Sequence, residues 1–540
     1  MRELSTDILI VGGGTGGIAA ALAAASRGAA CIVTEPYTWV GGQLTSQAVP
    51  PDENQWIETY GGTRLYQSFR ERVRAWYREQ SPLTEAARSI PRLNPGNGWV
   101  SRLCAEPRVM HGVLRTMIDE CSPRPMVMAG LIPISAEVEG DRLRAVAFRG
   151  EGGGCEPECV ISAKMILDAT ELGDLYTLAG VEHAIGAEAA SVYGELHGRP
   201  DRTDPMDQQA FSWCFALEHR PGEDHTIPPP PSYEFWHSYV PAMDPPWCGP
   251  LFSWTVPTHN EAGCRTFPFL PPPEECPAGV WDMWRYRRII DQALFDPASG
   301  VRDVTIVNWV QMDYWLKPLL GVDAAAQAAA FAGAREQSLC FLHWMQTRAP
   351  RADGGQGFPG LRLRGDEVGT ADGFAMAPYI REPRRLTART IITEGHIGTE
   401  QRKREGRPHQ DRTKYGCAEL FADSVGIGHY TLDLHPSTAG RNSVYVPAAP
   451  FRIPMGSLIP VRVRNLLAAG KGIGVTHITN GCYRMHHTEW NIGESAGALA
   501  AWCLRRGMDP AAVHESATEI ADFQRELAAC GVRLSWPWET

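Results

Sequence analysis

Three glycines near the N-terminus, Gly12, Gly14 and Gly17, have the types and the spacing that bind phosphate groups. They match the pattern G-x-G-x-x-G and follow the apolar run 8–11, which is typical of a strand buried on both faces of a parallel sheet. The first glycine allows a tight turn, the second lets the backbone approach a pyrophosphate, and the third lets the next helix pack closely. Free N–H groups at the start of that helix attract phosphates. The pattern predicts a dinucleotide site, and the alternative is a strand, turn and helix without a ligand.

A second predicted strand, at residues 30–35, favours the dinucleotide because it ends in the carboxylate of Glu35. In this fingerprint an acidic side chain about twenty residues after the glycines binds a ribose hydroxyl. The loop that follows contains Gly41 and Gly42, whose lack of side chains allows close contact with a flat or phosphorylated ligand.

The elements that must position these residues are predicted from hydrophobic periodicity, and they indicate an α/β fold with a Rossmann-like sheet. Helices are predicted at 61–78 and 101–121. The first has apolar side chains on one face and arginines on the other. A hairpin over 136–148, followed by a buried strand at 163–170, indicates an inserted antiparallel β layer.

The middle of the chain changes character, because residues 195–285 are rich in proline and aromatic residues. Few regular elements tolerate that proline density. The segment is either an irregular insert packed by its own aromatics or a lid that faces a substrate. An alanine-rich helix is predicted at 322–346. Near the C-terminus a strand at 465–470 meets a glycine turn, and a helix of small residues is predicted from 490 to 502, where Gly493 and Gly497 allow close contact with a ligand or a strand.

The chain has 540 residues, which predicts two or three domains, and its 51 basic and 62 acidic side chains give a net charge of −11. That charge argues against a partner that is nucleic acid or an anionic membrane. No apolar run reaches the roughly 18 residues of a membrane span. Glu3 and Asp7 precede the first apolar run and no basic cluster leads it, so we expect a cytoplasmic protein without a signal peptide. A homo-oligomer is left open.

The 14 cysteines form no paired C-x-x-C sets, so most are expected to be reduced thiols. Cys155 and Cys159 are the closest pair. A metal or redox role for this pair is the less favoured alternative.

Several motifs together resemble the FAD-dependent oxidoreductases of the glutathione-reductase-like superfold. Residues 12–35 are similar to the ADP-binding fingerprint and residues 40–45 to the loop that approaches the flavin. Residues 168–174 resemble the motif D-A-T-G-x-G-D, with Glu171 where glycine is usual. Residues 357–360 and 378–385 are similar to the middle motif, and residues 465–470, His477, Arg484 and 493–497 to the C-terminal flavin-binding segment.

The resemblance implies a bound FAD and a discontinuous Rossmann-like domain formed by residues 1–180 and 450–508. Residues 181–449 would form the substrate or cap domain, and residues 509–540 a helical tail. A helix that begins near Gly493 would direct its positive end at the flavin ring. The cofactor-binding residues implied are Gly12, Gly14, Thr15, Gly17, Glu35, Gly42, Gln43, Thr45, Thr170, Asp174, Gly470, Gly493 and Glu494.

Hydride removal from an alcohol or amine needs a base and groups that hold the substrate. The candidates are His477 as base or orienting group, Arg484 as an anchor, and Asn480 between them. The alternative for His477 is a hydrogen-bonded structural histidine. A metal site at the pair 486–487 is disfavoured, because no ligand stands at a helical spacing from it.

Other polar residues of the chain leave two interpretations open. His429 and His435 either line the substrate side or brace loops. Arg381, Arg384 and Arg385 form either an anion site near the flavin or an ion-paired or solvated surface run.

The sequence therefore favours an FAD-dependent oxidase or dehydrogenase that takes a hydride from a small polar metabolite to flavin N5, with oxygen or another acceptor reoxidising the flavin. A single-component flavin monooxygenase that uses NAD(P)H is the first alternative, and a non-catalytic FAD-binding partner or maturation protein is the second. A pyridine-nucleotide disulfide reductase is disfavoured, since the sequence has neither a second dinucleotide motif nor a redox cysteine pair.

Overall fold

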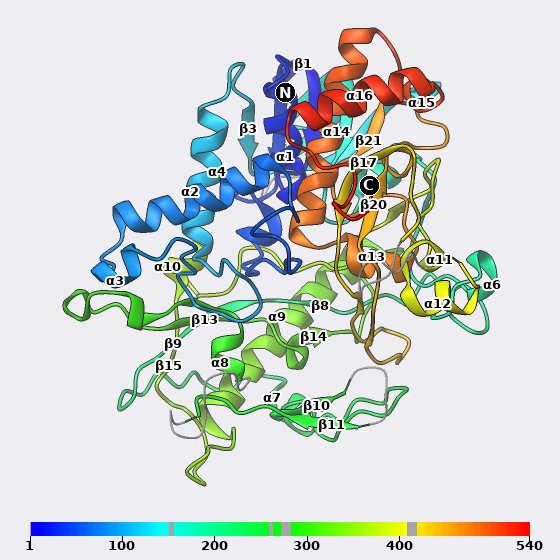
Figure 1. The fold of residues 1–540 in the computed structure, drawn as a ribbon. Coiled ribbons are helices and arrows are strands. Elements are labelled where there is room, and N and C mark those ends of the chain that lie inside the picture. The colour runs from blue at the N-terminus through cyan, green and yellow to red at the C-terminus, as the bar shows by residue number, and fades with distance from the viewer. Residues whose placement is uncertain (1, 151–155, 259–262, 272–281, 408–417, 540) are drawn as a thin grey trace.

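The computed structural model describes residues 2–150, 156–258, 263–271, 282–407 and 418–539 (Figure 1). Its main sheet has seven strands: β1 (Arg2–Val11), β2 (Cys31–Glu35), β3 (Met126–Ala129), β4 (Leu131–Glu139), β5 (Arg142–Gly150), β6 (Cys159–Asp168) and β21 (Leu466–Ala468). The strand order is β3-β2-β1-β6-β5-β4, and β21 also pairs with β6.

The parallel part of this sheet consists of β3, β2, β1, β6 and β21. The hairpin β4–β5 adds to β6 in the antiparallel sense. β6 pairs with β5 along residues 159–162 and with β21 along residues 166–168, so the antiparallel layer branches from the parallel sheet. The predicted α/β class and the inserted β layer are confirmed.

Two helices of small residues pack against each other beside this sheet. α1 (Thr15–Ala25) is fully buried and contacts α14 (His486–Arg506). A Cβ built on Gly493 would lie 1.9 Å from the Gly16 carbonyl oxygen, and one built on Gly497 would lie 2.1 Å from that of Ala20. The expectation that a helix begins near Gly493 is wrong, because α14 starts at His486 and these glycines serve contact between helices.

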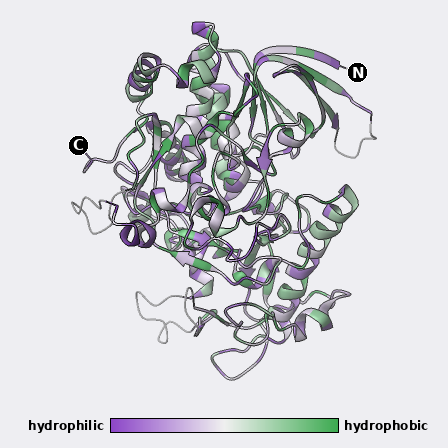
Figure 2. Cartoon of the chain, turned by 90° about the vertical axis from the view of Figure 1, so that its right-hand side faces the viewer, coloured by the Kyte–Doolittle hydropathy of each residue, from purple (hydrophilic) through white to green (hydrophobic). Residues whose placement is uncertain are grey.

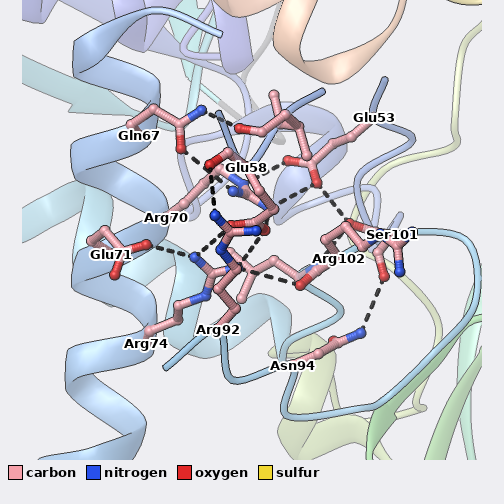
Figure 3. A network of polar contacts seen from close by, with 12 residues as sticks. Glu53, Glu58, Gln67, Arg70, Glu71, Arg74, Arg92, Asn94, Ser101 and Arg102 are labelled. Carbon is pink, nitrogen blue, oxygen red and sulfur yellow. Dashed lines mark hydrogen bonds and ion pairs between the residues drawn. The ribbon is translucent and has the colours of Figure 1, made fainter. Parts of the chain in front are cut away.

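The helix predicted at 61–78 is present as α2 (Arg64–Gln80), but its arginines are not all solvated. Arg70 and Arg74 are fully buried. Arg70 pairs with Glu53 at 2.9 Å, and both arginines lie 2.6 Å from Glu58 (Figure 3). The loop 50–63 folds over this face of α2 and supplies both carboxylates, and sequence periodicity alone does not reveal such a cover. Guanidinium groups are buried here because each has a carboxylate partner.

A second hydrophobic core lies in the part of the chain between Ala210 and Ile380. It contains many aromatic side chains, among them Trp236 and Trp254, and α9 (Ala324–Thr347) contributes Trp344 to it. The four-stranded sheet of this part has the order β12-β13-β9-β15. This part of the chain occupies the lower half of Figure 1. The aromatic residues of the proline-rich segment thus pack against one another, as one of the two interpretations expected. The predicted domain boundaries themselves stay predictions.

Cys248 and Cys264 form a disulfide in this half of the molecule, which was not singled out from the sequence. Most cysteines of the described residues are free thiols, as expected. Cys155 lies outside the described residues, and Cys159 is buried in β6. Across the residues that the structure covers, no group of His, Cys, Asp or Glu is arranged to hold a metal ion.

The C-terminal tail is helical, as expected, with α15 (Pro510–His514) and α16 (Ala517–Ala529). It returns to the nucleotide-binding half, where Glu526 pairs with Arg27 at 2.7 Å. Within the described ranges, no helix has both the length and the apolar character needed to cross a bilayer. Figure 2 shows hydrophilic and hydrophobic residues mixed along the helices.

The remaining helices and strands are short apart from one helix, α4 (Pro107–Asp119), which fulfils the prediction at 101–121. The other helices are α3 (Glu85–Arg88), α5 (Asp174–Leu178), α6 (Ala190–Tyr193), α7 (Tyr233–Ser238), α8 (Met283–Tyr286), α10 (Gly365–Val368), α11 (Glu394–Ile397), α12 (Thr399–Arg404) and α13 (His477–Tyr483). The other strands are β7 (His183–Ala184), β8 (Phe211–Ser212), β9 (Phe215–His219), β10 (Thr255–Pro257), β11 (Cys264–Thr266), β12 (Arg288–Ile290), β13 (Val304–Val307), β14 (Asp313–Tyr314), β15 (Leu361–Leu363), β16 (Arg385–Leu386), β17 (Ser424–Gly428), β18 (Leu432–Leu434), β19 (Val444–Val446) and β20 (Phe451–Pro454).

Candidate cofactor and substrate site

A cavity of about 420 Å³ opens where the parallel strands end. The glycine turn, Glu35 and the loop after β6 line one side of it. Phe331 of α9 also lines it, together with Ala377, Pro378 and Ile380. The cavity therefore lies between the sheet and the half of the molecule that holds the second core. This is the edge at which open α/β sheets bind ligands.

The glycine turn has the geometry that the sequence predicts. Gly12 has φ +100°, and a Cβ there would lie 2.2 Å from the Ala169 carbonyl oxygen. A Cβ on Gly17 would lie 2.0 Å from the Gly12 carbonyl oxygen, so this glycine permits the close contact of helix and strand. Gly14 is the N-cap of α1 and makes no side-chain cap, and the first turn holds no acidic residue. The helix start is thus open toward an anion.

Glu35 lines the cavity, and both of its carboxylate oxygens accept hydrogen bonds from the backbone. Oε2 accepts from the Gly13 N–H at 2.8 Å and Oε1 from the Tyr37 N–H at 3.2 Å. Burial raises the pKa of Glu35 to about 8, against the lowering effect of these two N–H groups. Each oxygen keeps a lone pair that a ribose hydroxyl could use.

The loop after β2 is held against the glycine turn. The Gly41 N–H donates to the Gly13 carbonyl at 2.8 Å, and the Thr15 hydroxyl donates to the Gly41 carbonyl at 2.8 Å. The Thr45 hydroxyl donates to the Val40 carbonyl at 2.7 Å. Thr15 and Thr45, expected to bind the cofactor, therefore use their hydroxyls to fix this loop.

Gln47 was not singled out from the sequence, and it lines the cavity beyond this loop. Its side chain is fully buried, and neither end of its amide has a hydrogen-bond partner in the described part of the chain. A buried amide without partners is costly, so Gln47 is poised to bind a ligand. No local pattern distinguishes this glutamine from an ordinary loop residue.

Thr170 and Asp174 lie at the cavity, as predicted, and they order the loop after β6. The Thr170 hydroxyl donates to Asp168 at 2.7 Å and accepts from the Asp174 N–H at 2.7 Å. Asp174 pairs with Arg384 at 3.3 Å. Burial raises the pKa of Asp168 to about 7.

Glu171 and Lys471 form a buried ion pair inside this site that the sequence did not reveal. Lys471 follows Gly470, the predicted glycine after β21, and its ammonium also donates to the Ile380 carbonyl at 2.7 Å. Lys471 is only 2% exposed. The sequence feature that could have indicated this lysine is its place between two glycines just after a predicted strand.

The start of α14 lies beside the start of α1. Gln43 donates to the Arg484 carbonyl at 3.1 Å and to Glu489 in the first turn of α14. Burial raises the pKa of Glu489 to about 7, although the Lys471 ammonium acts in the opposite direction. Gln43 therefore joins the cavity loop to α14, and its Oε1 has no partner among the residues described.

Gly493 and Glu494, predicted to contact the cofactor, lie away from the cavity lining. Gly493 faces the backbone of α1. Glu494 accepts a hydrogen bond from Thr63 at 2.6 Å and one from Trp490 at 3.2 Å. These contacts join α14 to the start of α2. Because α14 begins at His486, seven residues before Gly493, these two residues lie about two turns into the helix and not at its start.

His477 and Asn480 lie in α13 and are buried. The Nδ1 of His477 lies 2.7 Å from Glu188 Oε2, which also accepts from the His477 N–H at 2.9 Å. Burial lowers the pKa of His477, while Glu188 acts against this shift. Glu188 also pairs with Arg385 at 2.7 Å. The Asn480 amide has no partner within the described residues.

Arg484 belongs to a chain of buried charges on the other side of Gln43. It contacts the Tyr379 hydroxyl at 2.8 Å and Asp433 at 3.1 Å. His435 lies 2.6 Å from Asp313, which pairs with Arg381 at 3.0 Å. Arg381 and Arg385 are therefore buried, and Arg384 lines the cavity. All three are ion-paired with carboxylates, so the run is not solvated, and its role as an anion site stays a prediction.

A second set of polar groups continues from Gln47. Asp52 lies 3.4 Å from Arg287, and its N–H donates to His486 Nδ1 at 3.0 Å. Burial acts against the charge of Arg287, but Asp52 outweighs it and raises the pKa of the guanidinium. Asp52 and Tyr430 act electrostatically on both Arg287 and Arg484, so the two sets are close to one another.

A model of the family described as FAD dependent oxidoreductase matches residues 7–527. A comparison of the sequence with curated proteins found no match. Among solved structures, a geranylgeranyl bacteriochlorophyll reductase-like protein from Thermoplasma acidophilum is 9% identical over 98% of this chain and 85% of its own, with a TM-score of 0.31. The THI4 protein of Thermovibrio ammonificans is 17% identical over 35% and 69%, with a TM-score of 0.24. The p-nitrophenol 4-monooxygenase PnpA of Pseudomonas putida DLL-E4 is 13% identical over 41% and 48%, with a TM-score of 0.23.

Proposed function

Because the chain belongs to the FAD-dependent oxidoreductase family, we propose that it oxidises a small polar metabolite of the alcohol, sugar or amine type. When bound, FAD would supply hydride acceptance at N5, followed by reoxidation by oxygen or another acceptor. The substrate, the direction of electron flow and the acceptor are all parts of this proposal.

The cavity fits the nucleotide part of FAD in most respects. The uncapped start of α1 suits a diphosphate, and Glu35 suits a ribose. In the lining, Gln47 offers a buried amide that lacks partners among the described residues. Gln43, which follows the lining residue Gly42, has a buried Oε1 that likewise lacks one. Glu171 is the exception, because its carboxylate lies where a diphosphate is expected.

The observation that carries the proposal is the buried polar cluster formed by Asp52, Arg287, Tyr379, Asp433 and Arg484. Oδ1 of Asp52 and Nε of both arginines have no hydrogen-bond partner in the described chain. A buried donor or acceptor without a partner costs about 1–3 kcal/mol. A polar substrate that hydrogen-bonds to these atoms removes that cost and gains binding free energy, whereas an apolar substrate leaves them unpaired. This favours a substrate with several hydroxyl, amino or carboxylate groups.

Within this cluster each group has a role that its contacts support. Arg287 and Arg484 would orient the substrate by donating hydrogen bonds. Asp52 would accept the proton that leaves a hydroxyl or ammonium group as the hydride departs. The loop 46–52 joins Asp52 directly to the cavity-lining Ser46 and Gln47.

The test is anaerobic bleaching of the flavin absorbance of the FAD-loaded protein against a panel of sugars, polyols, amines and amino acids. We expect one class to bleach it, and Asp52→Asn to slow the bleaching about 100-fold while the Kd for FAD stays unchanged. Asp353→Asn is the matched control, because Asp353 is an exposed carboxylate paired with Arg351. Bleaching by NAD(P)H alone would establish the monooxygenase alternative instead, and no bleaching by any compound would favour a non-catalytic FAD binder.

A further inference from the structure

Glu171 lies directly over the start of α1. A Cβ built on Gly14 would lie 2.9 Å from Glu171 Oε1, and one built on Gly42 would lie 2.8 Å from the same atom. Gly14 is the N-cap of α1 and Gly42 belongs to the loop packed on it. The carboxylate thus fills the space that the missing side chains of both glycines leave.

Among the described residues, Lys471 is the cation that pairs with this carboxylate. Apart from this ion pair, no backbone or side-chain donor in that part of the chain hydrogen-bonds to either oxygen of Glu171. The N–H groups at the start of α1 therefore do not bind the carboxylate, although it lies beside them. The Glu171 carboxylate is thus held by the Lys471 ammonium alone and not by a set of backbone donors.

A diphosphate would bind both the N–H groups at the start of α1 and the Lys471 ammonium, whereas Glu171 contacts only the ammonium. The diphosphate oxygens can accept hydrogen bonds from the N–H groups at the helix start and also pair with a nearby ammonium. A diphosphate and the Glu171 carboxylate cannot share this space, because like charges at such distances repel strongly. Lys471 comes from the loop after β21, which β6 holds beside the loop that carries Glu171.

We propose that Glu171 is an internal competitor of the cofactor: its carboxylate, paired with Lys471, occupies the diphosphate position at the start of α1 until FAD displaces it. On binding, the diphosphate takes over Lys471 and the Glu171 side chain leaves the turn. The inference concerns the loading of the cofactor and is independent of the substrate proposed above.

The first experiment compares the affinities of the apoprotein and its Glu171→Gln variant for FAD, measured by quenching of flavin fluorescence. The neutral amide has the same size but forms no ion pair and does not repel phosphate. We expect FAD to bind about tenfold more tightly to the variant. ADP, which carries the same diphosphate, should gain by a similar factor, and adenosine, which lacks it, should not.

The second experiment replaces Lys471. Lys471→Met leaves Glu171 without its cation, so FAD should bind about tenfold more weakly than to the unaltered protein or worse. Adding Glu171→Gln to Lys471→Met should recover much of this loss. The double-mutant cycle thereby reports the coupling of the two side chains.

Glu182→Gln is the matched control, because Glu182 pairs with Arg462 at the surface, 2.7 Å away, outside the cavity lining. It should leave the Kd for FAD unchanged. The proposal is overturned if Glu171→Gln binds FAD equally or more weakly, since Glu171 would then be neutral or a cofactor ligand. These binding measurements need no substrate, so they fail or succeed separately from the bleaching test.

Discussion

His477 is held by its surroundings in the manner of a structural residue. Glu188 accepts from its backbone N–H and contacts its ring Nδ1, and the side chain is 1% exposed. Arg385 completes a buried line of charges with Glu188. The backbone N–H of Glu188 also lies 3.2 Å from His477 Nδ1, so the ring is tied to the segment that carries Glu188. The geometry favours an anchoring role for His477 at the start of α13.

His477→Gln should therefore lower the free energy of unfolding by about 1–3 kcal/mol, because Glu188 loses a buried hydrogen bond. The rate at which substrate reduces the bound flavin should stay within about threefold of the original. Urea unfolding and anaerobic stopped-flow absorbance measure the two quantities. A rate that falls about 100-fold in a variant of unchanged stability would restore His477 as the base.

The residues that sequence reasoning located are those whose role is local. Gly12 and Gly17 are needed by a turn and by a helix–strand contact within six residues, so their pattern is visible in the chain. The pairs Glu171–Lys471 and Asp52–Arg287 join segments far apart in the sequence. The pairing of β21 with β6 brings Lys471 to Glu171, and the course of the loop 46–52 brings Asp52 to Arg287. Neither contact produces a pattern that can be read within one segment of the sequence.

The contact between α1 and α14 connects the two ends of the chain behind the cofactor turn. Gly493 and Gly16 allow the helix backbones to touch, and Glu489 of α14 accepts from the Gly16 N–H at 3.4 Å. The position of α1, and with it the anion site at its start, depends on this contact.

Gly493→Ala should therefore displace α1, lower the free energy of unfolding by about 1–3 kcal/mol and weaken FAD binding. Gly112→Ala is the matched control, because Gly112 lies in the middle of α4 and an added Cβ there meets nothing within 4 Å. That variant should be about 0.5–1 kcal/mol more stable. Chemical unfolding and FAD titration of both variants decide the matter, and equal stability of the two would contradict a role for close helix contact.

Most elements of this protein were predictable by type, and α14 shows why boundaries were less so. Its N-cap is Met485, whose side chain makes no cap hydrogen bond, so the usual start signal is missing. α13, which ends only at Tyr483, is capped by Thr476. The fully buried Arg70 and Arg74 of α2 show the same limit, since helical periodicity does not reveal which loop will cover a polar face.

The molecule as a whole buries many carboxylates, and the fold raises the pKa of several. Burial raises the pKa of Glu35 to about 8 and that of Glu195 to about 8. Glu195 Oε1 accepts from the Thr476 hydroxyl at 2.6 Å and from the Glu394 N–H at 2.8 Å. Each of these groups holds a proton in the folded state that the unfolded chain has already released at neutral pH.

The free energy of unfolding of the apoprotein should therefore fall between pH 7 and pH 8, by up to about 1.4 kcal/mol per pH unit for each such group. The sign follows because a raised carboxyl pKa gives stability at low pH that is lost as the pH passes the folded-state value. Above about pH 7 histidines such as His477 are neutral in both states and do not contribute. Urea unfolding at the two pH values measures the slope. Glu195→Gln should reduce it and Asp353→Asn, at an exposed site, should leave it unchanged; an unaltered slope in Glu195→Gln would refute the assignment.

The pairing of β21 with β6 has a consequence for biogenesis. The glycine turn leaves the ribosome long before residues 466–506 are made, and until then β6 lacks its neighbour and α1 lacks α14. Lys471 and the start of α14 can reach the nascent turn only after residues 466–506 have been synthesised. Flavin capture therefore has to wait for residues 466–506, and a polypeptide released before β21 would carry the nucleotide fingerprint without being able to close a pocket around it.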